Sequence, residues 1–413
     1  MEQNERKILI PQYIKKFKCI GSNCEDSCCI GWRIDIDYDT YRKYKTSKDK
    51  KLQLIINKNI SKNRSGNQTH ENYAKIKLKN NKCPFLGEEK LCKIQLEKGY
   101  EYLSKTCATY PRYSSIIDGI LEKSLTMSCP EAVRLALLNP KPMEFDEEFE
   151  PRDKSIAIQQ EIRTNEIKSI TTGNKYFWKL RIFIISLLQN RRYDIEERMI
   201  ILGLFVRKVQ ECIDNKRTND IPIIIKSYTE YIQENIFKEN LENIPTKNFV
   251  QLKLLKNIID KKYSQGIKNK RYLECFDEFL KGIDYEDDKD LEEISLIYKN
   301  ACNNYYTPFF SDKKYILENY LVNYVFKNTF PFSNEKSIFD EYMMLVIHYS
   351  LIKMHLIGVG AFHKGLSDEL VVKVIQSIAK TIEHNTGYLN NIKELMKDNK
   401  FNNMAYMAVL LKN

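Results

Sequence analysis

The distribution of the cysteines is the feature that most constrains this chain. Eight of its 11 cysteines lie between residues 19 and 129, where an even distribution would put about three. Thiolates gathered in one segment repel one another unless a cation neutralises them, so we expect this segment to bind metal. The predicted metal ligands are Cys19, Cys24, Cys28, Cys29, Cys83, Cys92, Cys107 and Cys129. The other three, Cys212, Cys275 and Cys302, stand alone in apolar helical segments and are interpreted as small core residues.

The spacing of the eight cysteines favours an iron–sulfur cluster over zinc. Structural zinc sites usually use two short Cys-x2–4-Cys pairs, whereas only the run Cys-x4-Cys-x3-Cys-Cys at residues 19–29 is closely spaced here. Two of the other cysteines begin Cys-Pro steps, at Cys83 and Cys129, and such a step also ends the bacterial ferredoxin ligand run. Two four-cysteine centres, or one cluster with four bystanders, are both compatible with this order.

The N-terminal residues predict a cytoplasmic protein. Charged residues precede a short apolar run at residues 8–10, which does not resemble the apolar core of a signal peptide. Disulfides are the poorer explanation for the cysteines in a reducing compartment. The longest apolar stretch, residues 342–361, contains His348, Lys353 and His355, and is therefore predicted to be a core helix rather than a transmembrane segment. The net charge of +11 comes from Lys spread along the whole chain, so we expect no nucleic-acid partner.

Apolar periodicity predicts a mainly α protein with two domains. Residues 1–138 form the expected cysteine-rich metal domain, with little regular structure or with short strands at residues 34–39 and 73–79. Three prolines and an acidic run predict a linker at residues 139–153. An α-helical bundle is expected over residues 154–413, because apolar residues recur at helical spacing in the segments 176–188, 199–209, 221–236, 249–259, 315–326, 342–357 and 370–382.

Several motifs carry a resemblance to a known family. They are the string at residues 17–32 with its double cysteine, followed by the segments 83–86, 91–95, 106–112 and 124–131. The order of these motifs resembles the flagellin lysine N-methylase family, and the first half also resembles the broader cysteine-cluster proteins. Segments 318–331 and 342–353 are similar to the helical C-terminal half of the methylases, so the resemblance spans nearly the whole chain.

The resemblance implies a protein-lysine N-methyltransferase of the class EC 2.1.1. Such an enzyme uses S-adenosylmethionine to methylate surface lysines of flagellin and depends on one or two [4Fe-4S] clusters. The usual radical motif Cys-x3-Cys-x2-Cys is absent, because Cys24-x3-Cys28 is followed at once by Cys29. The competing hypothesis is a non-catalytic, zinc-stabilised helical module that binds proteins.

Other candidate site residues are few, and no catalytic residue is predicted. The chain has no Gly-x-Gly-x-x-Gly cradle for a nucleotide, so the site for S-adenosylmethionine is expected to be unconventional. Trp32 is a candidate to shield the cluster or stack on the adenine, and Arg112 is a candidate to hold a carboxylate. The acidic residues at 35, 37 and 39 would attract a lysine if they shared a strand face, although a solvated strand edge is the more ordinary interpretation.

The size of the second domain suggests a protein substrate. About 260 residues without a readable catalytic motif exceed what a small metabolite requires, whereas protein recognition commonly uses about 800 Å² per partner. We therefore expect this domain to dock flagellin, with Tyr305, Tyr306, Phe309 and Phe310 among the aromatic residues suited to an interface. His348 and His355, seven residues apart, are interpreted as core or partner-facing.

Overall fold

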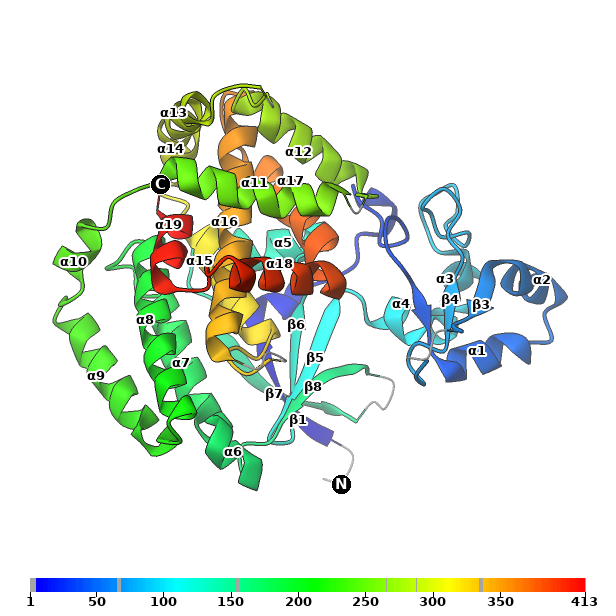
Figure 1. Ribbon diagram of the computed structural model, residues 1–413. Helices are drawn as coiled ribbons and strands as arrows, with labels where there is room; N and C mark the ends of the chain where they lie inside the picture. The colour runs from blue at the N-terminus through cyan, green and yellow to red at the C-terminus, as the bar shows by residue number, and fades with distance from the viewer. Residues whose placement is uncertain are drawn as a thin grey trace.

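The chain forms a large main body and a small lobe that projects from it (Figure 1). The computed structural model describes residues 5–64, 68–152, 156–264, 266–286, 288–333 and 337–412. The main body consists of a helical bundle packed against a five-stranded sheet, and three of the eight predicted metal ligands, Cys83, Cys92 and Cys107, lie in the small lobe. The prediction of a mainly α protein is confirmed.

The small lobe combines short helices with a three-stranded sheet. Its elements are β2 (Asp35–Ile36), α1 (Tyr38–Lys45), α2 (Lys50–Asn59), β3 (Ile60–Lys62), β4 (Ala74–Ile76), α3 (Lys93–Lys98) and α4 (Lys105–Thr109). The strands pair antiparallel in the order β2-β4-β3. A small apolar core that includes Ile36, Ile56 and Phe85 fills the space between sheet and helices. The lobe therefore has a hydrophobic core of its own in addition to its thiols.

The alternating segment at residues 34–39 is a strand for two residues only. Asp37 is the N-cap of α1, and its carboxylate accepts hydrogen bonds from the backbone N–H groups of Thr40 and Lys105 at 2.9 and 3.0 Å. An aspartate cap satisfies free N–H groups at the start of a helix, and this ends the strand. The three aspartates do not form the shared strand face that a lysine site would need.

The sheet of the main body contains strands from both predicted domains. Its order is β7 (Phe145–Pro151), β1 (Glu5–Pro11), β6 (Ile120–Leu125), β5 (Arg112–Ile117) and β8 (Ile158–Ile162). β1 pairs antiparallel with β7 and parallel with β6, while β8 runs parallel to β5.

Part of the predicted linker at residues 139–153 is a strand of the sheet, because residues 145–151 form β7. Its acidic side chains face the basic strand β1, where Arg6 bonds Glu150 at 2.9 Å and Lys7 bonds Glu147 at 2.7 Å. The acidic run is thus one half of a cross-strand charge pattern.

The hydrophobic cores divide the chain differently from the predicted border at residue 138. Tyr13, Phe17 and Leu125 belong to the same core as the helical bundle, as does helix α5 (Pro130–Leu137). The separate core of the small lobe covers residues 34–107. The N-terminal strand and residues 112–138 are therefore part of the main body, and only the intervening segment forms the small lobe.

Seven helices of the main body match the predicted periodic segments: α7 (Phe177–Leu188), α8 (Ile195–Asp214), α9 (Ile221–Gln233), α11 (Asn248–Ser264), α15 (Tyr315–Lys327), α16 (Ile338–Phe362) and α17 (Asp368–Ile378). Among the helices that lie outside those segments are α12 (Lys270–Gly282), α13 (Leu291–Ala301), α14 (Thr307–Phe310), α18 (Thr386–Asp398) and α19 (Met404–Leu411). Two π-helical turns, η7 (Cys302–Tyr306) and η8 (Ala379–Glu383), interrupt this regular packing.

Helix α16 is the centre of the bundle. It is long and apolar enough to cross a membrane by length and composition, but 89% of its most apolar window is buried inside the protein. The prediction of a core helix is confirmed. Helix α12 crosses α16 so closely that a Cβ atom added to Gly358 would lie 2.4 Å from the Phe279 ring.

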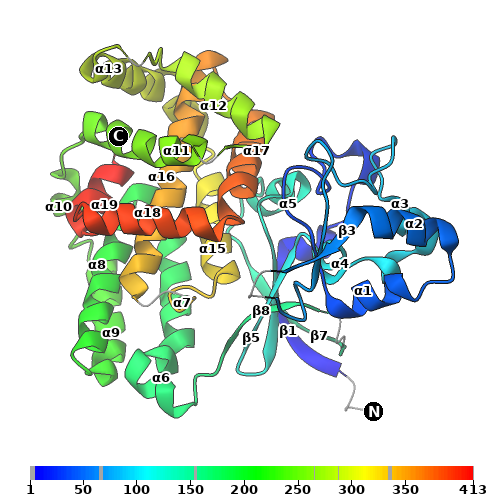
Figure 2. The ribbon, with the colours of Figure 1, turned by 45° about the vertical axis from the view of Figure 1, so that its right-hand side comes forward.

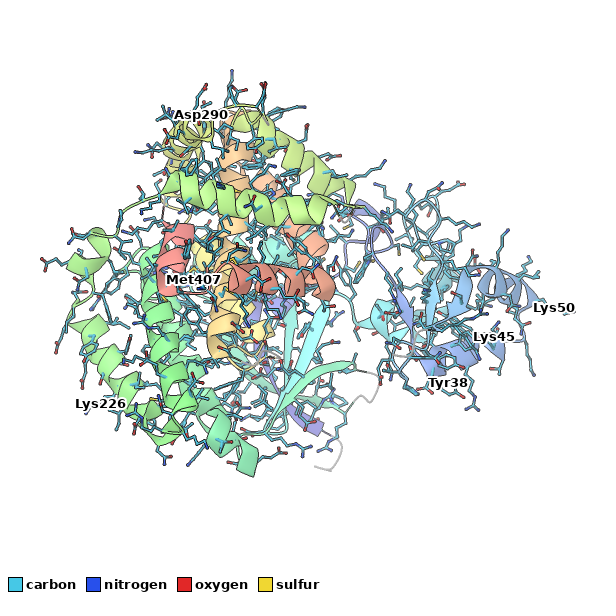
Figure 3. All side chains as sticks on the ribbon, in the orientation of Figure 1. Tyr38, Lys45, Lys50, Lys226, Asp290 and Met407 are labelled. Atoms are coloured by element: carbon cyan, nitrogen blue, oxygen red, sulfur yellow. The ribbon has the colours of Figure 1, made fainter. Side chains whose placement is uncertain are left out.

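Basic side chains are spread over both parts of the molecule. Lys45 and Lys50 lie on the small lobe and Lys226 lies on the far side of the main body, all three exposed, whereas Met407 is buried among the helices (Figure 3). This spread matches the distribution of Lys along the chain.

Candidate metal centre at the junction of the two lobes

The first four cysteines lie on the loop that joins the main body to the small lobe. This loop, residues 18–34, follows the buried Phe17 and leads into β2. Gly21 and Gly31 adopt positive φ angles of 58° and 93°, which side chains with a Cβ rarely tolerate, and so let the loop fold back on itself. The backbone N–H of Cys83 donates to the carbonyl of Cys29 at 2.8 Å, which ties the double cysteine to a second cysteine-bearing segment.

Four thiols come together inside the small lobe. Cys29, Cys83, Cys92 and Cys107 pack against one hydrophobic core, and we call them the lobe thiols. The side chains of Cys29 and Cys83 are in hydrogen-bond contact. Cys107 lies within electrostatic range of both Cys29 and Cys92. The sequence order, with ligands up to 78 residues apart, did not indicate which cysteines share a site.

A second group of three thiols lies at the junction with the main body. Cys24 lies within electrostatic range of Cys19, and Cys129 lies within range of both. We call Cys19, Cys24 and Cys129 the junction thiols. Cys28 lies between the groups, because it contacts Cys29 and shares Tyr110 as a neighbour with Cys129.

Cys29, Cys107 and Cys129 have raised pKa values, so these three thiols are protonated at neutral pH as long as no cation neutralises them. Burial is the main cause that raises the pKa of Cys107 to about 12 and that of Cys129 to about 12. The hydrogen bond with Cys28 lowers the pKa of Cys29, but the contact with Cys83 and burial together raise it to about 12. A bound cation reverses this preference, because it stabilises the thiolate form that ligates metal.

The donor set fits a cysteine-ligated centre in its chemistry. The lobe thiols supply four sulfur ligands of the type that Zn²⁺ and iron–sulfur clusters use. Among the residues that the structure describes, no three His, Cys, Asp or Glu side chains are already arranged to hold a single metal ion. Metal binding would therefore require the thiols to deprotonate and adjust their side-chain positions.

Helix α17 and the π-turn η8 hold the cysteine loop against the main body. The Lys380 ammonium donates to both carboxylate oxygens of Asp26, at 2.9 and 2.8 Å, and to the Ser27 carbonyl at 3.0 Å. Gln376 donates to Asp26 at 2.7 Å and to the Ser128 carbonyl at 2.9 Å. Figure 2 shows α17 beside the strands and loops that lead into the small lobe. We call these contacts the Asp26 latch.

An aromatic group lies between the thiols and η8. The ring of Trp32 is 5.1 Å from that of Tyr110 and 5.1 Å from that of His384, and its indole N–H donates to the Cys28 carbonyl. His384 Nε2 and the Tyr110 hydroxyl both contact the hydroxyl of Ser128, at 2.9 and 3.3 Å. Burial lowers the pKa of His384 to about 4, so its imidazole is neutral at pH 7. Trp32 therefore covers the Cys28 side of the junction.

Behind this aromatic group lies a buried ion pair. Lys327 and Glu383 bond at 2.6 Å with both side chains under 9% exposed, and Tyr320 also donates to Glu383. Burial opposes the ionisation of Glu383, but the nearby positive charge of Lys327 holds the pKa of this carboxyl below its ordinary value. Sequence reasoning missed Lys327, Lys380, Glu383 and His384. The signal available for Lys380 was a charged residue inside the apolar repeat 370–382.

Arg112, the other predicted cofactor-binding residue, is exposed at the start of β5. Its guanidinium lies 5.3 Å from the centre of the Phe17 ring, and no carboxylate partner is recorded for it among the described side chains. Asp35 pairs with Arg33 at 2.8 Å and Asp39 lies near His70. The structure thus gives Asp35 and Asp39 the solvated positions that the ordinary interpretation predicted.

The two histidines of α16 and the aromatic residues near residue 306 are mainly core. His348 and His355 are both buried, and each contacts a carbonyl one turn earlier in the helix. Tyr306 and Phe310 are buried as well and offer almost no outer surface to a protein partner, whereas Tyr305 and Phe309 are half-buried. Their ring contacts, such as 4.5 Å between Tyr306 and Phe310, stabilise the packing around η7.

Comparison with known proteins decides the family. Residues 181–410, more than half of the chain, match the family model described as the FliB lysine N-methylase C-terminal domain. The chain belongs to the FliB lysine N-methylase family. This confirms the resemblance found in the sequence motifs.

Relatives extend the similarity to the cysteine-bearing part. The lysine-N-methylase of Salmonella typhimurium strain LT2 is 25% identical over 394 residues, which cover 92% of this chain and 93% of that protein. A lysine-N-methylase of Salmonella choleraesuis is equally similar over 391 residues. The flagellar biosynthetic protein FliU of Salmonella muenchen is 35% identical over 137 residues, 33% of this chain and 80% of that protein. No solved structure matches the chain significantly.

Proposed function

We propose that this protein methylates lysine ε-amino groups of flagellin, with S-adenosylmethionine as methyl donor, and that its cysteines hold a [4Fe-4S] cluster. Lysine methylation is supported by the family and by relatives named lysine-N-methylase over 92% of the chain. Flagellin as the substrate is supported by the flagellar name of the relative FliU. The family match, over residues 181–410, lies in the main body.

The grouping of the thiols is the observation that carries the cofactor part of the proposal. The four lobe thiols would hold one cluster, with Tyr44 and Leu103 among the residues that shield it. The three junction thiols, together with Cys28, form a candidate second set. If only the three junction thiols ligated it, a cluster there would leave one iron open, and that iron could bind amino and carboxylate groups.

The residues of the junction have separate roles in this proposal. The contact with Cys29 and burial raise the pKa of Cys28, and the positive charge of Lys380 opposes part of that rise. Trp32 and Tyr110 exclude water from the Cys28 side, because their rings pack together over the loop. An acceptor lysine has an ordinary pKa of about 10.4 and must lose a proton before polar attack on a sulfonium methyl group. We assign no base for that proton.

Metal analysis combined with an activity assay tests the proposal. Protein purified without oxygen should be brown, contain iron and acid-labile sulfide, and transfer labelled methyl groups from S-adenosylmethionine to intact flagellin. Colourless protein with stoichiometric zinc and no methyl transfer would instead support a zinc-stabilised binding module. Methyl transfer by a fully iron-free protein would remove the cluster from the reaction while leaving the methylase activity in place.

A further inference from the structure

The main body contains a cavity of about 570 Å³ whose lining residues all lie outside the metal junction. Its walls come from the start of α8, the π-turn η7, helices α14 to α16 and the C-terminal segment. This volume falls inside the range of about 300–1,000 Å³ that is usual for small-molecule sites. The π-turn η7 contributes Cys302, Asn303 and Tyr306, and such turns are frequent at functional sites.

A buried ion pair forms one wall of this cavity. Lys353 lies 2.6 Å from Glu196, and the Tyr349 hydroxyl donates to the same oxygen of Glu196 at 2.8 Å. The Lys353 side chain is only 6% exposed, whereas that of Glu196 is 23% exposed and lines the cavity. Burial opposes the ionisation of Glu196, but Lys353 and Tyr349 outweigh it and hold its pKa below the ordinary value. The cavity therefore contains a carboxylate fixed in its charged form.

Buried ion pairs contribute little to stability, because the loss of hydration offsets their attraction. Perturbed charges in a cleft are instead typical of binding and catalytic sites. The ion pair of Glu196 and Lys353 lies in the main body, and it has no role in holding the proposed cluster.

The cavity presents both signs of charge to a ligand. Asp194, Glu196 and Glu197 stand on the first turn of α8 or its cap, while Lys314, Lys353 and Lys412 come from three other segments. The Lys314 side chain is half exposed and pairs with Asp194, so its ammonium can reorient toward a ligand carboxylate. Phe310, Leu317 and Ile195 supply apolar surface between the charges.

We infer that this cavity binds a small molecule that carries a free α-amino acid group. The ligand ammonium would meet Glu196, and the ligand carboxylate would meet Lys314. A side chain or nucleoside attached to the amino acid would lie along Phe310 and Tyr306. Two sources share this chemistry: a sulfonium methyl donor such as S-adenosylmethionine, and a free amino acid. The assignment of S-adenosylmethionine rests on the proposed function, whereas the assignment of an α-amino acid group to the cavity does not.

Binding measured by calorimetry on the full-length, anaerobically purified protein tests the inference. The probes are S-adenosylmethionine, S-adenosylhomocysteine, methionine and lysine. Asn303→Trp fills the cavity from its exposed rim, and Asn304→Trp is the matched control, because Asn304 is the exposed next residue of η7 and does not line the cavity. Asn303→Trp should weaken binding of at least one probe tenfold or more, while Asn304→Trp should leave it unchanged. Glu196→Gln should also weaken it tenfold or more.

The outcomes separate the sources and the two proposals. Weakened binding of S-adenosylmethionine and S-adenosylhomocysteine identifies the donor, and weakened binding of lysine or methionine alone identifies a free amino acid. The inference is overturned when no probe binds, or when Asn303→Trp binds every probe with unchanged affinity. It is also overturned when Cys28→Ser abolishes donor binding but the cavity variants do not, because the donor then binds at the junction. An iron-free or inactive protein contradicts the proposed function and leaves these binding results interpretable.

Discussion

Replacing Lys380 by methionine should destabilise the junction, because it leaves the Asp26 carboxylate without its cation. Lys380 is 5% exposed and Asp26 12%, and the two are joined by hydrogen bonds of 2.9 and 2.8 Å. Breaking a buried pair by removing one partner typically costs about 3–5 kcal/mol. Gln376 continues to donate to Asp26, so we expect a loss of about 2–4 kcal/mol in the free energy of unfolding.

A double-mutant cycle isolates the latch from other effects. Asp26→Asn alone should also destabilise the protein, because Lys380 loses its negatively charged partner and keeps only neutral acceptors such as the Ser27 carbonyl. The double variant, Asp26→Asn with Lys380→Met, should lose about 1.5–3 kcal/mol less stability than the sum of the two single losses, because neither charge remains unpaired in it. Lys281→Met is the matched control. Its ion pair with Asp277 is about 60% exposed on both sides, so the loss should stay below about 0.5 kcal/mol.

Fluorescence gives a local readout of this cycle. The chain has two tryptophans, Trp32 at the junction and Trp178 on helix α7. In a Trp178→Phe background, urea unfolding followed by fluorescence reports on Trp32 alone, beside the latch. Additive losses within about 0.5 kcal/mol, or a loss below 1 kcal/mol for Lys380→Met, would refute the assigned role of the latch.

Three further predictions concern the thiols, a buried histidine and the crossing of two helices. Changing Cys28 and Cys29 together to serine should abolish metal content and methyl transfer. Cys275→Ser should keep both and lower the free energy of unfolding by only about 1–2 kcal/mol. Full metal content in the double variant would exclude Cys28 and Cys29 as ligands. His355 is fully buried, and burial lowers its pKa to about 4. The unfolded chain takes up a proton at this residue near pH 6.5, whereas the folded protein does so only near pH 4. The free energy of unfolding should therefore fall by roughly 3 kcal/mol as the pH drops from about 6.5 to about 4. His355→Phe should flatten that part of a urea-midpoint titration, and an unchanged slope would contradict the assignment. Gly358→Ala would place a Cβ atom 2.4 Å from the Phe279 ring and should lower stability by at least about 1–3 kcal/mol in the same assay, whereas Gly387→Ala, with its nearest atom at 3.7 Å, should not.

Local sequence patterns were enough to predict seven helices of the main body and the presence of a cysteine-rich segment. Helical periodicity is a local property, so the apolar residues at 315–326 and 342–357 predicted α15 and α16 without knowledge of their neighbours. The burial of α16 followed from its polar residues, which a lipid-facing helix would expose. The density of cysteines between residues 19 and 129 also predicted shared chemistry without any distance.

How these parts meet depends on contacts between residues far apart in the chain. The acidic segment at 145–151 has the composition of a linker, but pairing with the basic strand β1, about 140 residues earlier, makes it a strand. The separation of the thiols into a group of four and a group of three depends on loops whose ends are far apart in the chain. Lys380 and Asp26 are 354 residues apart, and no local pattern links them. The physical reason is that periodicity and propensity act over a few residues, whereas burial makes a distant charge necessary only once the chain has folded around it.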